Sequence, residues 1–373
     1  MQSLCCCAPC LFGLEGLAAD ELRRMGAQQV QAENGRVLFA GDWHTLAAAN
    51  LWLRTAERVE IVLGQFNAAT FDELFEGTRA LPWEDFIGRQ NAFPVKGWSL
   101  DSALHSVPDC QSIIKKAIVE RLRGRYHVAW FEETGPALPV RFSIRKNAVT
   151  LMLDSSGAGL HKRGYRAVAS QAPIKETLAA AMVALARPYE DSVLYDPFCG
   201  SGTILIEGAL QACNVAPGLR RRFAAEEWDC LPAGTFAAAR DQARAQINRQ
   251  APFRCVGADL DPAMVALTLQ NAQKAGVAGR LQAAAADVAA FAPTTPRGIV
   301  VTNPPYGERL LDVQAARELY RRMGAVMEKK PGWRYAVISP DEQFEEHFGR
   351  PADKKRKLYN GMLRCTLYLY FKG

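Results

Sequence analysis

The second half of the chain alternates short apolar segments with longer stretches of helical periodicity. The apolar segments lie at residues 193–195, 254–258, 298–302 and 335–339, and the helical stretches at 203–213, 262–275 and 315–328. Strands and helices that alternate in this way pack as a parallel sheet with helices on both faces. Segments 357–359 and 362–370 flank Asn360-Gly361, a pair typical of a type I′ hairpin turn, so one strand should run antiparallel. The sequence therefore predicts an α/β fold for this half.

The loop after the first of these strands is rich in glycine and opens with an acidic residue. It reads Asp-Pro-Phe-Cys-Gly-Ser-Gly-Thr at 196–203. Gly200 and Gly202 have no Cβ atom, which lets a ligand lie against the main chain. The spacing is not that of a dinucleotide-binding loop, because Leu205 takes the place of the third glycine. The Asp196 carboxylate would repel a pyrophosphate but suits a sulfonium or ammonium group.

Two further strands also end near carboxylates. Asp259 ends the second strand and could accept hydrogen bonds from both hydroxyls of a ribose. Asp287 follows one unit later, where its carboxylate and a neighbouring main-chain N–H could bind an adenine edge. Three carboxylates at successive junctions, together with the glycine loop, predict S-adenosylmethionine as the cofactor. The residues expected to bind it are Asp196, Phe198, Gly200, Ser201, Gly202, Thr203, Asp259 and Asp287.

Asn-Pro-Pro-Tyr at 303–306 follows the apolar strand 298–302, at the sheet edge where open α/β folds bind ligands. The Asn303 side-chain carbonyl and the Pro304 main-chain carbonyl can both accept hydrogen bonds from one NH₂ group. Pro304 and Pro305 restrict the backbone and hold these acceptors in place. Tyr306 offers a flat face on which a base can stack. Asn303, Pro304, Pro305 and Tyr306 are thus the expected catalytic residues, acting on an exocyclic amino group.

Four motifs together resemble those of the THUMP-domain RNA methyltransferases. They are Leu-His-Lys-Arg-Gly-Tyr-Arg at 160–166, Ala-Pro-Ile-Lys-Glu-Thr-Leu at 172–178, the loop 196–203 and Asn-Pro-Pro-Tyr-Gly-Glu-Arg at 303–309. The chain is most similar to the N-terminal half of the bifunctional 23S rRNA guanine-N2 methyltransferase. The resemblance implies a ferredoxin-like module at 1–65 and a THUMP RNA-binding domain at 66–157. It also implies a class I (Rossmann-like) methyltransferase domain with a mixed seven-stranded sheet at 158–373.

The charge distribution is consistent with a polyanionic substrate. Residues 1–157 hold 16 Lys and Arg against 18 Asp and Glu, whereas residues 158–373 hold 29 against 21. Two groups of side chains are candidates for RNA binding. Lys115, Lys116 and Arg121 lie on a helix expected over 112–123, where a solvated helix face is the alternative. Lys162, Arg163, Tyr165 and Arg166 form a basic and aromatic segment that could lie along RNA.

Neither a membrane span nor a metal site is expected. The sequence has no apolar run of 18 residues, and Met1-Gln2-Ser3-Leu4 lacks the basic start of a signal peptide, so we expect a cytoplasmic protein. Cys5, Cys6 and Cys7 are adjacent in a strand and point to opposite faces, so they cannot converge on one metal. No second pair at zinc spacing follows. The cysteines are therefore interpreted as small core residues.

The resulting expectation is methyl transfer to an exocyclic amino group of a base in structured RNA, with guanine N2 in 23S rRNA preferred. Adenine N6 in RNA or DNA, glutamine N5 in a protein and a non-catalytic RNA-binding role are the alternatives. Ribosomal RNA is the expected partner, and transfer RNA is the other candidate. Glu308 is a candidate acceptor for the N1–H of guanine, which adenine lacks.

Overall fold

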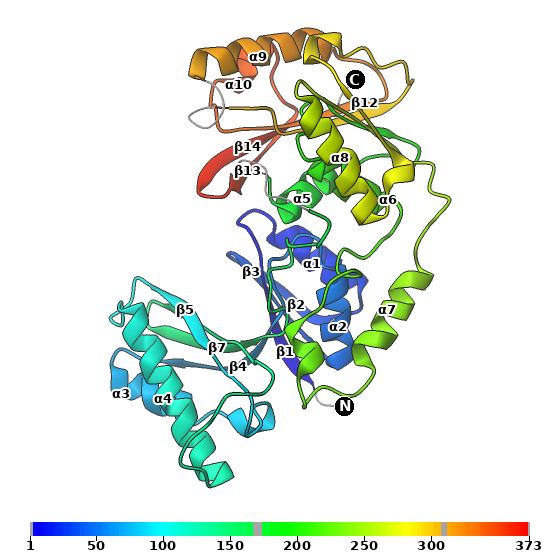
Figure 1. The fold of residues 1–373 in the computed structure, drawn as a ribbon. Helices are drawn as coiled ribbons and strands as arrows, with labels where there is room; N and C mark the ends of the chain where they lie inside the picture. The colour runs from blue at the N-terminus through cyan, green and yellow to red at the C-terminus, as the bar shows by residue number, and fades with distance from the viewer. Residues whose placement is uncertain (1–2, 167–173, 307–311, 372–373) are drawn as a thin grey trace. The chain divides into compact units, whose positions relative to one another are not determined.

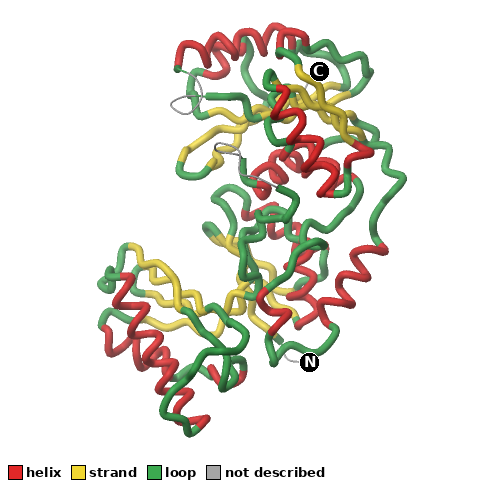
Figure 2. Tube along the Cα trace, viewed as in Figure 1, coloured by secondary structure: helices red, strands yellow, loops and turns green. Residues whose placement is uncertain are grey.

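The computed structural model describes residues 3–166, 174–306 and 312–371. These residues form two compact units (Figures 1 and 2). The first consists of Met1–Cys10, Ala18–Leu160 and Arg221–Asp241. The second consists of Leu11–Leu17, His161–Arg220 and Gln242–Gly373. The segments Leu11–Leu17 and Arg221–Asp241 thus each belong to a different unit from the residues on either side of them.

The first unit is built on a seven-stranded sheet. Its strands are β1 (Leu4–Pro9), β2 (Gln28–Glu33), β3 (Arg36–Gly41), β4 (Glu60–Asn67), β5 (Val95–Leu100), β6 (Val140–Arg145) and β7 (Ala148–Asp154). Their order is β2-β3-β1-β4-β7-β6-β5, and only β5 and β6 pair in parallel. The helices are α1 (Glu15–Arg24), α2 (Trp43–Trp52), α3 (Phe71–Arg79) and α4 (Val107–Tyr126), and α7 (Thr235–Ala245) begins here.

The second unit is also built on seven strands. They are β8 (Val193–Asp196), β9 (Arg254–Asp259), β10 (Leu281–Ala285), β11 (Gly298–Thr302), β12 (Trp333–Ser339), β13 (Lys354–Asn360) and β14 (Leu363–Tyr370). Their order is β10-β9-β8-β11-β12-β14-β13, and β14 runs antiparallel to both its neighbours. The predicted mixed seven-stranded sheet with one reversed strand is therefore confirmed.

Helices cover both faces of this second sheet. Successive side chains of each buried strand point to opposite faces, so each face needs its own apolar core. Leu194 and Ile299 face a core that includes α5 (Glu176–Ala186), α6 (Thr203–Ala212) and α8 (Pro262–Ala275). Tyr195 and Val300 face the opposite core, with α9 (Val313–Val326) and α10 (Phe344–Phe348). The helices α8 and α9 can be followed in Figure 1.

The turn between β13 and β14 differs from the predicted type I′ turn by one residue. Asn360 pairs with Leu363, so the two-residue loop is Gly361-Met362. Gly361 has a left-handed φ of +67°, and Asn360 does not. A type I′ turn needs positive φ at both central residues, whereas glycine at the first position alone fits type II′. The hairpin is confirmed, and its Asn-Gly turn prediction is corrected to Gly-Met.

The segment Leu11–Leu17 packs into the core of the second unit. Leu14 is fully buried in the same cluster as Leu358 of β13. Gly13 has a φ of +89°, and a Cβ atom there would lie 2.7 Å from the Lys357 carbonyl oxygen. Only glycine allows this approach of a loop to the edge strand β13.

Candidate active site

The site is built where β8 and β11 lie side by side. After β8 the chain continues to β9, which pairs with one edge of β8, and β11 pairs with the other edge. This reversal of strand order is the point at which open α/β sheets bind ligands, beyond the carboxyl ends of the strands. Asp196 ends β8, Thr302 ends β11, and Asn303 follows directly. The cofactor loop and the Asn-Pro-Pro-Tyr motif are thus adjacent.

Asp196 is a buried carboxylate held by two hydrogen bonds. Its Oδ1 atom accepts from Thr302 Oγ1 at 2.6 Å and from the main-chain N–H of Phe198 at 3.2 Å. Burial raises the pKa of Asp196 to about 7, and the two hydrogen bonds oppose part of that rise. A cation bound beside Asp196 would favour the ionised form.

The glycine loop is fixed to β9 and α8 through its main chain. The Cys199 N–H donates to the Ala258 carbonyl at 2.9 Å. Thr268 Oγ1 donates to the Gly200 carbonyl at 2.7 Å, and Asn271 Nδ2 donates to the Ser201 carbonyl at 2.9 Å. The loop conformation is therefore set by the protein itself, before any ligand binds.

The two glycines of this loop have different surroundings. Both have left-handed backbones, with φ of +51° at Gly200 and +80° at Gly202. A Cβ atom on Gly202 would lie 2.8 Å from Thr268 Cγ2, so this glycine is required by packing. A Cβ atom on Gly200 would meet no atom within 4 Å. Gly200 thus borders open space in which a ligand can approach the main chain.

Asp259 faces the same loop from the end of β9. Its Oδ2 atom accepts from the Gly200 N–H at 2.9 Å, and Oδ1 accepts from the Asp261 N–H at 3.0 Å. Each carboxylate oxygen has a further lone pair, so Asp259 can still accept from ligand hydroxyls. Asp196, Asp259 and the open space at Gly200 fit a cationic ligand that carries a ribose.

Asp287 lies beyond β10 and has a partner that the sequence did not indicate. Its Oδ1 atom accepts from the Ala289 N–H at 2.7 Å and pairs with the Arg322 guanidinium on α9. The hydrogen bond from Arg322 lowers the pKa of Asp287 most, followed by that from Ala289. Both contacts therefore favour the ionised form of the Asp287 carboxyl.

The remaining predicted cofactor residues lie in the same loop. Ser201 and Thr203 are buried, and their hydroxyl oxygens are 3.3 Å apart. Thr203 Oγ1 also accepts from the Arg166 guanidinium at 2.8 Å. Phe198 is half-buried and packs against the aromatic core cluster under α9. The structure thus brings seven of the eight predicted cofactor residues to the ends of β8 and β9, with Asp287 beyond β10.

Asn303 carries an unpaired acceptor. Its Oδ1 atom is buried and has no hydrogen-bond partner among the residues that the structure describes. Leaving such an oxygen unsatisfied costs about 1–3 kcal/mol. Pro304, next to it, is buried, and Pro305 is half-buried. An amino group that enters here would find a free acceptor held in a rigid segment.

Tyr306 is half-buried rather than lying on the surface. Its hydroxyl oxygen accepts a 2.7 Å hydrogen bond from Asn360 Nδ2 at the end of β13. Its ring packs against the core cluster that contains Leu358 and Cys365. Burial raises the pKa of the Tyr306 hydroxyl well above its ordinary value. The predicted extension Gly307-Glu308-Arg309 lies outside the described residues.

The basic residues predicted on α4 are mostly engaged within the protein. Lys115 donates to Glu133 and to the Phe93 carbonyl, and its ammonium lies 3.4 Å from the Phe93 ring centroid. Arg121 forms two hydrogen bonds to Glu84, at 2.6 and 3.0 Å. Lys116 is exposed. Lys116 is thus the residue of this group best placed to meet a phosphate.

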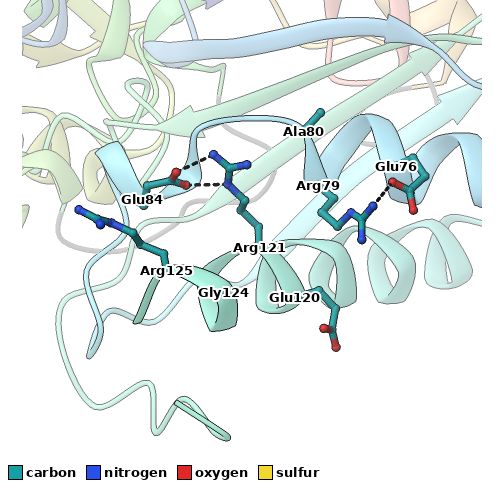
Figure 3. A pocket seen from close by; sticks show the side chains of 8 residues that line it. All are labelled: Glu76, Arg79, Ala80, Glu84, Glu120, Arg121, Gly124 and Arg125. Atoms are coloured by element: carbon teal, nitrogen blue, oxygen red, sulfur yellow. Dashed lines mark hydrogen bonds and ion pairs between the residues drawn. The ribbon is translucent and has the colours of Figure 1, made fainter. Parts of the chain in front are cut away.

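The pocket around Arg121 contains charges of both signs (Figure 3). Its lining residues are Glu76, Arg79, Ala80, Glu84, Glu120, Arg121, Gly124 and Arg125. Figure 3 shows the Arg121 guanidinium against Glu84, and Arg79 against Glu76. Three glutamates balance three arginines, so the pocket offers no excess of positive charge to an anion.

The basic and aromatic segment after residue 160 is largely buried. Arg163 is 3% exposed and lies 3.4–3.5 Å from the carboxylate oxygens of Glu207, which is fully buried on α6. Tyr165 is 4% exposed and donates to Glu207 at 3.1 Å. Arg166 pairs with Glu176 at 3.3 Å, and Lys162 is exposed. The expected exposed strip is therefore reduced to Lys162, because the buried Glu207 carboxylate requires Arg163 and Tyr165 as partners and Arg166 is paired with Glu176.

Cys6 and Cys7 are buried, and the ten cysteines are free thiols. Within the described part of the chain, no three His, Cys, Asp or Glu side chains come together in a way that could hold a metal ion. None of the helices in these described residues has the length and apolar character needed to span a membrane.

Three family models match successive parts of the chain. The RlmL ferredoxin-like domain matches residues 6–60, the THUMP domain 68–154, and the RMKL-like methyltransferase domain 163–369. The putative RNA methyltransferase YpsC of Bacillus subtilis (strain 168) is 44% identical over 362 residues, which cover 96% of this chain and 94% of that protein. Ribosomal RNA large subunit methyltransferase K/L of Shewanella baltica (strain OS195) is 32% identical over 368 residues. This chain spans about half the length of that relative, 52%.

Solved structures agree in fold over the full chain. A predicted N6-adenine-specific DNA methylase from Listeria monocytogenes str. 4b F2365 is 47% identical, with a TM-score of 0.94 over 100% of this chain and 97% of that one. SMU.472, a putative methyltransferase complexed with SAH, is 40% identical, with a TM-score of 0.95 over 100% and 99%. This chain belongs to the RMKL-like methyltransferase family, with an RlmL ferredoxin-like domain and a THUMP domain preceding the methyltransferase domain.

Proposed function

We propose that this protein transfers a methyl group from S-adenosylmethionine to an exocyclic amino group of a base in structured RNA, with guanine N2 of 23S rRNA as the target. The observation that carries the proposal is the unpaired Asn303 acceptor, one residue after the strand that is hydrogen-bonded to Asp196. An amino-binding group and a cation-binding loop then lie at neighbouring strand ends. The relatives named as RNA and rRNA methyltransferases support RNA as the substrate class.

Asp196, Asp259 and Asp287 provide the acceptors of the cofactor site, and Phe198, Gly200, Ser201, Gly202 and Thr203 form its loop. When bound, S-adenosylmethionine supplies an electrophilic methyl group on a permanently cationic sulfur. The ionised Asp196 carboxylate, buried and raised in pKa, gains most from a nearby positive charge. Asp259 retains lone pairs for the ribose hydroxyls. The complex of a 40% identical relative with SAH supports this assignment.

Asn303 and Pro304 would orient the target amino group. Its lone pair is conjugated into the base and is a weak nucleophile. Hydrogen bonds to the Asn303 and Pro304 carbonyls favour a more tetrahedral nitrogen whose lone pair is free to react. Positive charge develops on that nitrogen in the transition state, so two fixed carbonyl dipoles stabilise the transition state more than the ground state. The methylated nitrogen is then acidic, and its proton passes to water without a strong base.

Tyr306 would stack on the target base, and Pro305 would hold the turn between Pro304 and Tyr306. A base taken from a helix must be extruded to reach this site.

We assign RNA binding to the ferredoxin-like and THUMP domains, at 1–65 and 66–157, and methyl transfer to 158–373. Within the first of these parts, Lys116 is the predicted phosphate contact whose side chain is exposed, and Lys162 is its counterpart in the second.

Adenine N6 is the second candidate, because a 47% identical structure is described as a predicted N6-adenine-specific DNA methylase. The experiment that tests the substrate class offers RNA, duplex DNA and protein extract to the purified chain with methyl-labelled cofactor. We expect label in RNA, abolished by Asn303→Ala and unchanged by Asn248→Ala, an exposed asparagine in the loop before β9. Label in DNA or protein and none in RNA would refute the proposal.

A further inference from the structure

The Asn-Pro-Pro-Tyr segment is anchored at both ends to different parts of the sheet edge. At its start, Thr302 is hydrogen-bonded to Asp196 of β8. At its end, the Tyr306 hydroxyl reaches Asn360 of β13. β13 is separated from β11 by β12 and β14 in the sheet. The segment therefore crosses the ends of two intervening strands before Tyr306 is anchored.

The hairpin extends past the sheet to meet Tyr306. β12 ends at Ser339, which pairs with Thr366 of β14. Residues 363–365 of β14 have no partner on β12 and pair only with 358–360 of β13. This end of the hairpin (red in Figure 1) projects beyond the carboxyl ends of the parallel strands, where the site lies.

Asn360 is available to Tyr306 because of the turn that the hairpin adopts. In a type I′ turn at Asn360-Gly361, Asn360 would occupy a left-handed turn position. With the turn at Gly361-Met362, Asn360 stays in the strand, two residues after the buried Leu358 and on the same face. Leu358 and its cross-strand partner Cys365 belong to the core cluster against which the Tyr306 ring packs.

We propose that Asn360 is a positioning residue for the methyl transfer: it fixes the orientation of the Tyr306 ring on which the target base stacks. This inference rests on the proposed function. A phenol ring held at its hydroxyl cannot swing about the Cα–Cβ bond. Packing of the ring against the core cluster restricts its rotation about the Cβ–Cγ bond. The two contacts together set the stacking plane before the base arrives. A base displaced in the bound complex loses reaction rate more than affinity, because alignment with the methyl donor decides the rate.

The alternative is that this hydrogen bond only stabilises the hairpin. The two roles make different predictions for kinetics. A purely structural bond lowers the melting temperature and leaves kcat of the folded protein unchanged. A positioning bond lowers kcat at saturating RNA while KM for RNA changes little.

The test compares Asn360→Ala, Tyr306→Phe and the double variant on the full chain. Tyr306→Phe removes the hydroxyl and keeps the ring. We expect each single variant to lower kcat about tenfold, and the double variant to be no worse than either single one, because all three lose the same bond. Asn360→Asp should restore most of kcat, since its carboxylate can accept from the Tyr306 hydroxyl. Met362→Ala, at the 96% exposed neighbouring turn position, should behave as wild type.

Wild-type kcat in Asn360→Ala, or independent losses that multiply in the double variant, would overturn the proposal. Failure of the proposed function gives a different result, since wild type itself would then transfer no label to RNA. Calorimetric binding of the cofactor by every variant checks that the second unit is folded. Loss of kcat that follows the melting temperature, with no rescue by Asn360→Asp, would also count against Asn360 as a positioning residue.

Discussion

Thr302 donates a 2.6 Å hydrogen bond to the carboxylate of Asp196, and both side chains are buried at the ends of neighbouring strands. This bond joins the last residue of β11 to the last residue of β8. Asn303 follows Thr302 directly, and the glycine loop follows Asp196. This hydrogen bond and the pairing of β11 with β8 together hold Asn303 close to the glycine loop.

The first prediction concerns pH. The pKa of Asp196 is raised from its ordinary 3.8 to about 7, so in the free protein the carboxyl becomes protonated as the pH falls below 7. Binding of a cation next to it then requires loss of that proton. Affinity for S-adenosylmethionine should fall by up to about tenfold per pH unit below pH 7 and be level above it. Calorimetry from pH 5.5 to 8.5 measures this, and a flat profile would contradict it.

The same shift has the opposite effect on stability. A carboxyl whose pKa is higher in the folded chain than in the unfolded chain stabilises the fold most at low pH. This contribution is lost as the pH rises from about 4 to 7.

Thr302→Val removes a hydrogen bond to the ionised form of Asp196 and keeps the side-chain shape. It should move the pH of half-maximal cofactor binding upward by about one to two pH units. An unchanged profile in Thr302→Val would show that the bond does not influence Asp196.

The second prediction concerns Asp259. Asp259→Ala removes the acceptor of the Gly200 N–H and the acceptors proposed for the ribose hydroxyls. Cofactor affinity should fall about ten- to a hundredfold, the equivalent of about 1.5–3 kcal/mol for hydrogen bonds to a charged group. Asp241→Ala, outside the loop, serves as the control. Equal affinity in Asp259→Ala and wild type would exclude this residue from the cofactor site.

The third prediction compares alanine substitutions at two glycines that have the same backbone φ angle. Gly202 and Gly234 both have φ of +80°, but a Cβ atom added at Gly202 would lie 2.8 Å from Thr268 Cγ2, whereas one added at Gly234 would meet no atom within 4 Å. Gly234→Ala should cost about 1–2 kcal/mol, the penalty of a left-handed alanine. Gly202→Ala should cost more, because Thr268 must also move. Thermal unfolding measures the difference, and equal losses would contradict the packing argument.

The fourth prediction concerns residues 162–166, which the sequence predicted to bind RNA. Arg163→Ala leaves the fully buried Glu207 carboxylate without its cation and should destabilise the fold by about 3–5 kcal/mol. Lys116→Glu, at an exposed side chain, should leave the melting temperature unchanged and weaken RNA binding, and Lys162→Glu should also weaken RNA binding. If Arg163→Ala weakened RNA binding at an unchanged melting temperature, its role would be in RNA contact and not in the core.

The sequence predicted the second unit well where local patterns determine the structure. The alternation of apolar segments and helical stretches indicated the strands β8, β9, β11 and β12. The glycine loop and the Asn-Pro-Pro-Tyr motif were placed at strand ends by the same pattern. These features depend on residues close together in the chain, and the confirmed sheet follows from them.

Other features depend on contacts between distant residues and left no local signal. The burial of Leu14 beside Leu358 requires a loop from the start of the chain to cover the last strands. The pairing of Arg163 and Tyr165 with Glu207 could not be read from a segment that is basic and aromatic in sequence. A signal was present for Glu207, since a lone glutamate in the apolar helix 203–213 needs a partner if it is buried.

The turn type of the last hairpin could not be decided from the sequence alone. Asn360-Gly361 and Gly361-Met362 both fit two-residue hairpin turns, of types I′ and II′ respectively. The choice depends on the register of β13 and β14, which pairs Leu358 with Cys365 inside the core. Packing thus selected the second turn and left Asn360 free to bind Tyr306.

The most direct test of the central claim is the identity of the methylated nucleoside. The purified chain is incubated with methyl-labelled S-adenosylmethionine and ribosomal RNA from a strain lacking the gene, and the RNA is digested to nucleosides. We predict label in N2-methylguanosine with wild type, and none with Asn303→Ala, whose cofactor affinity should stay within a few-fold of wild type. Label in N6-methyladenosine with none in N2-methylguanosine would contradict the assignment of guanine, and wild-type labelling by Asn303→Ala would contradict the role of Asn303.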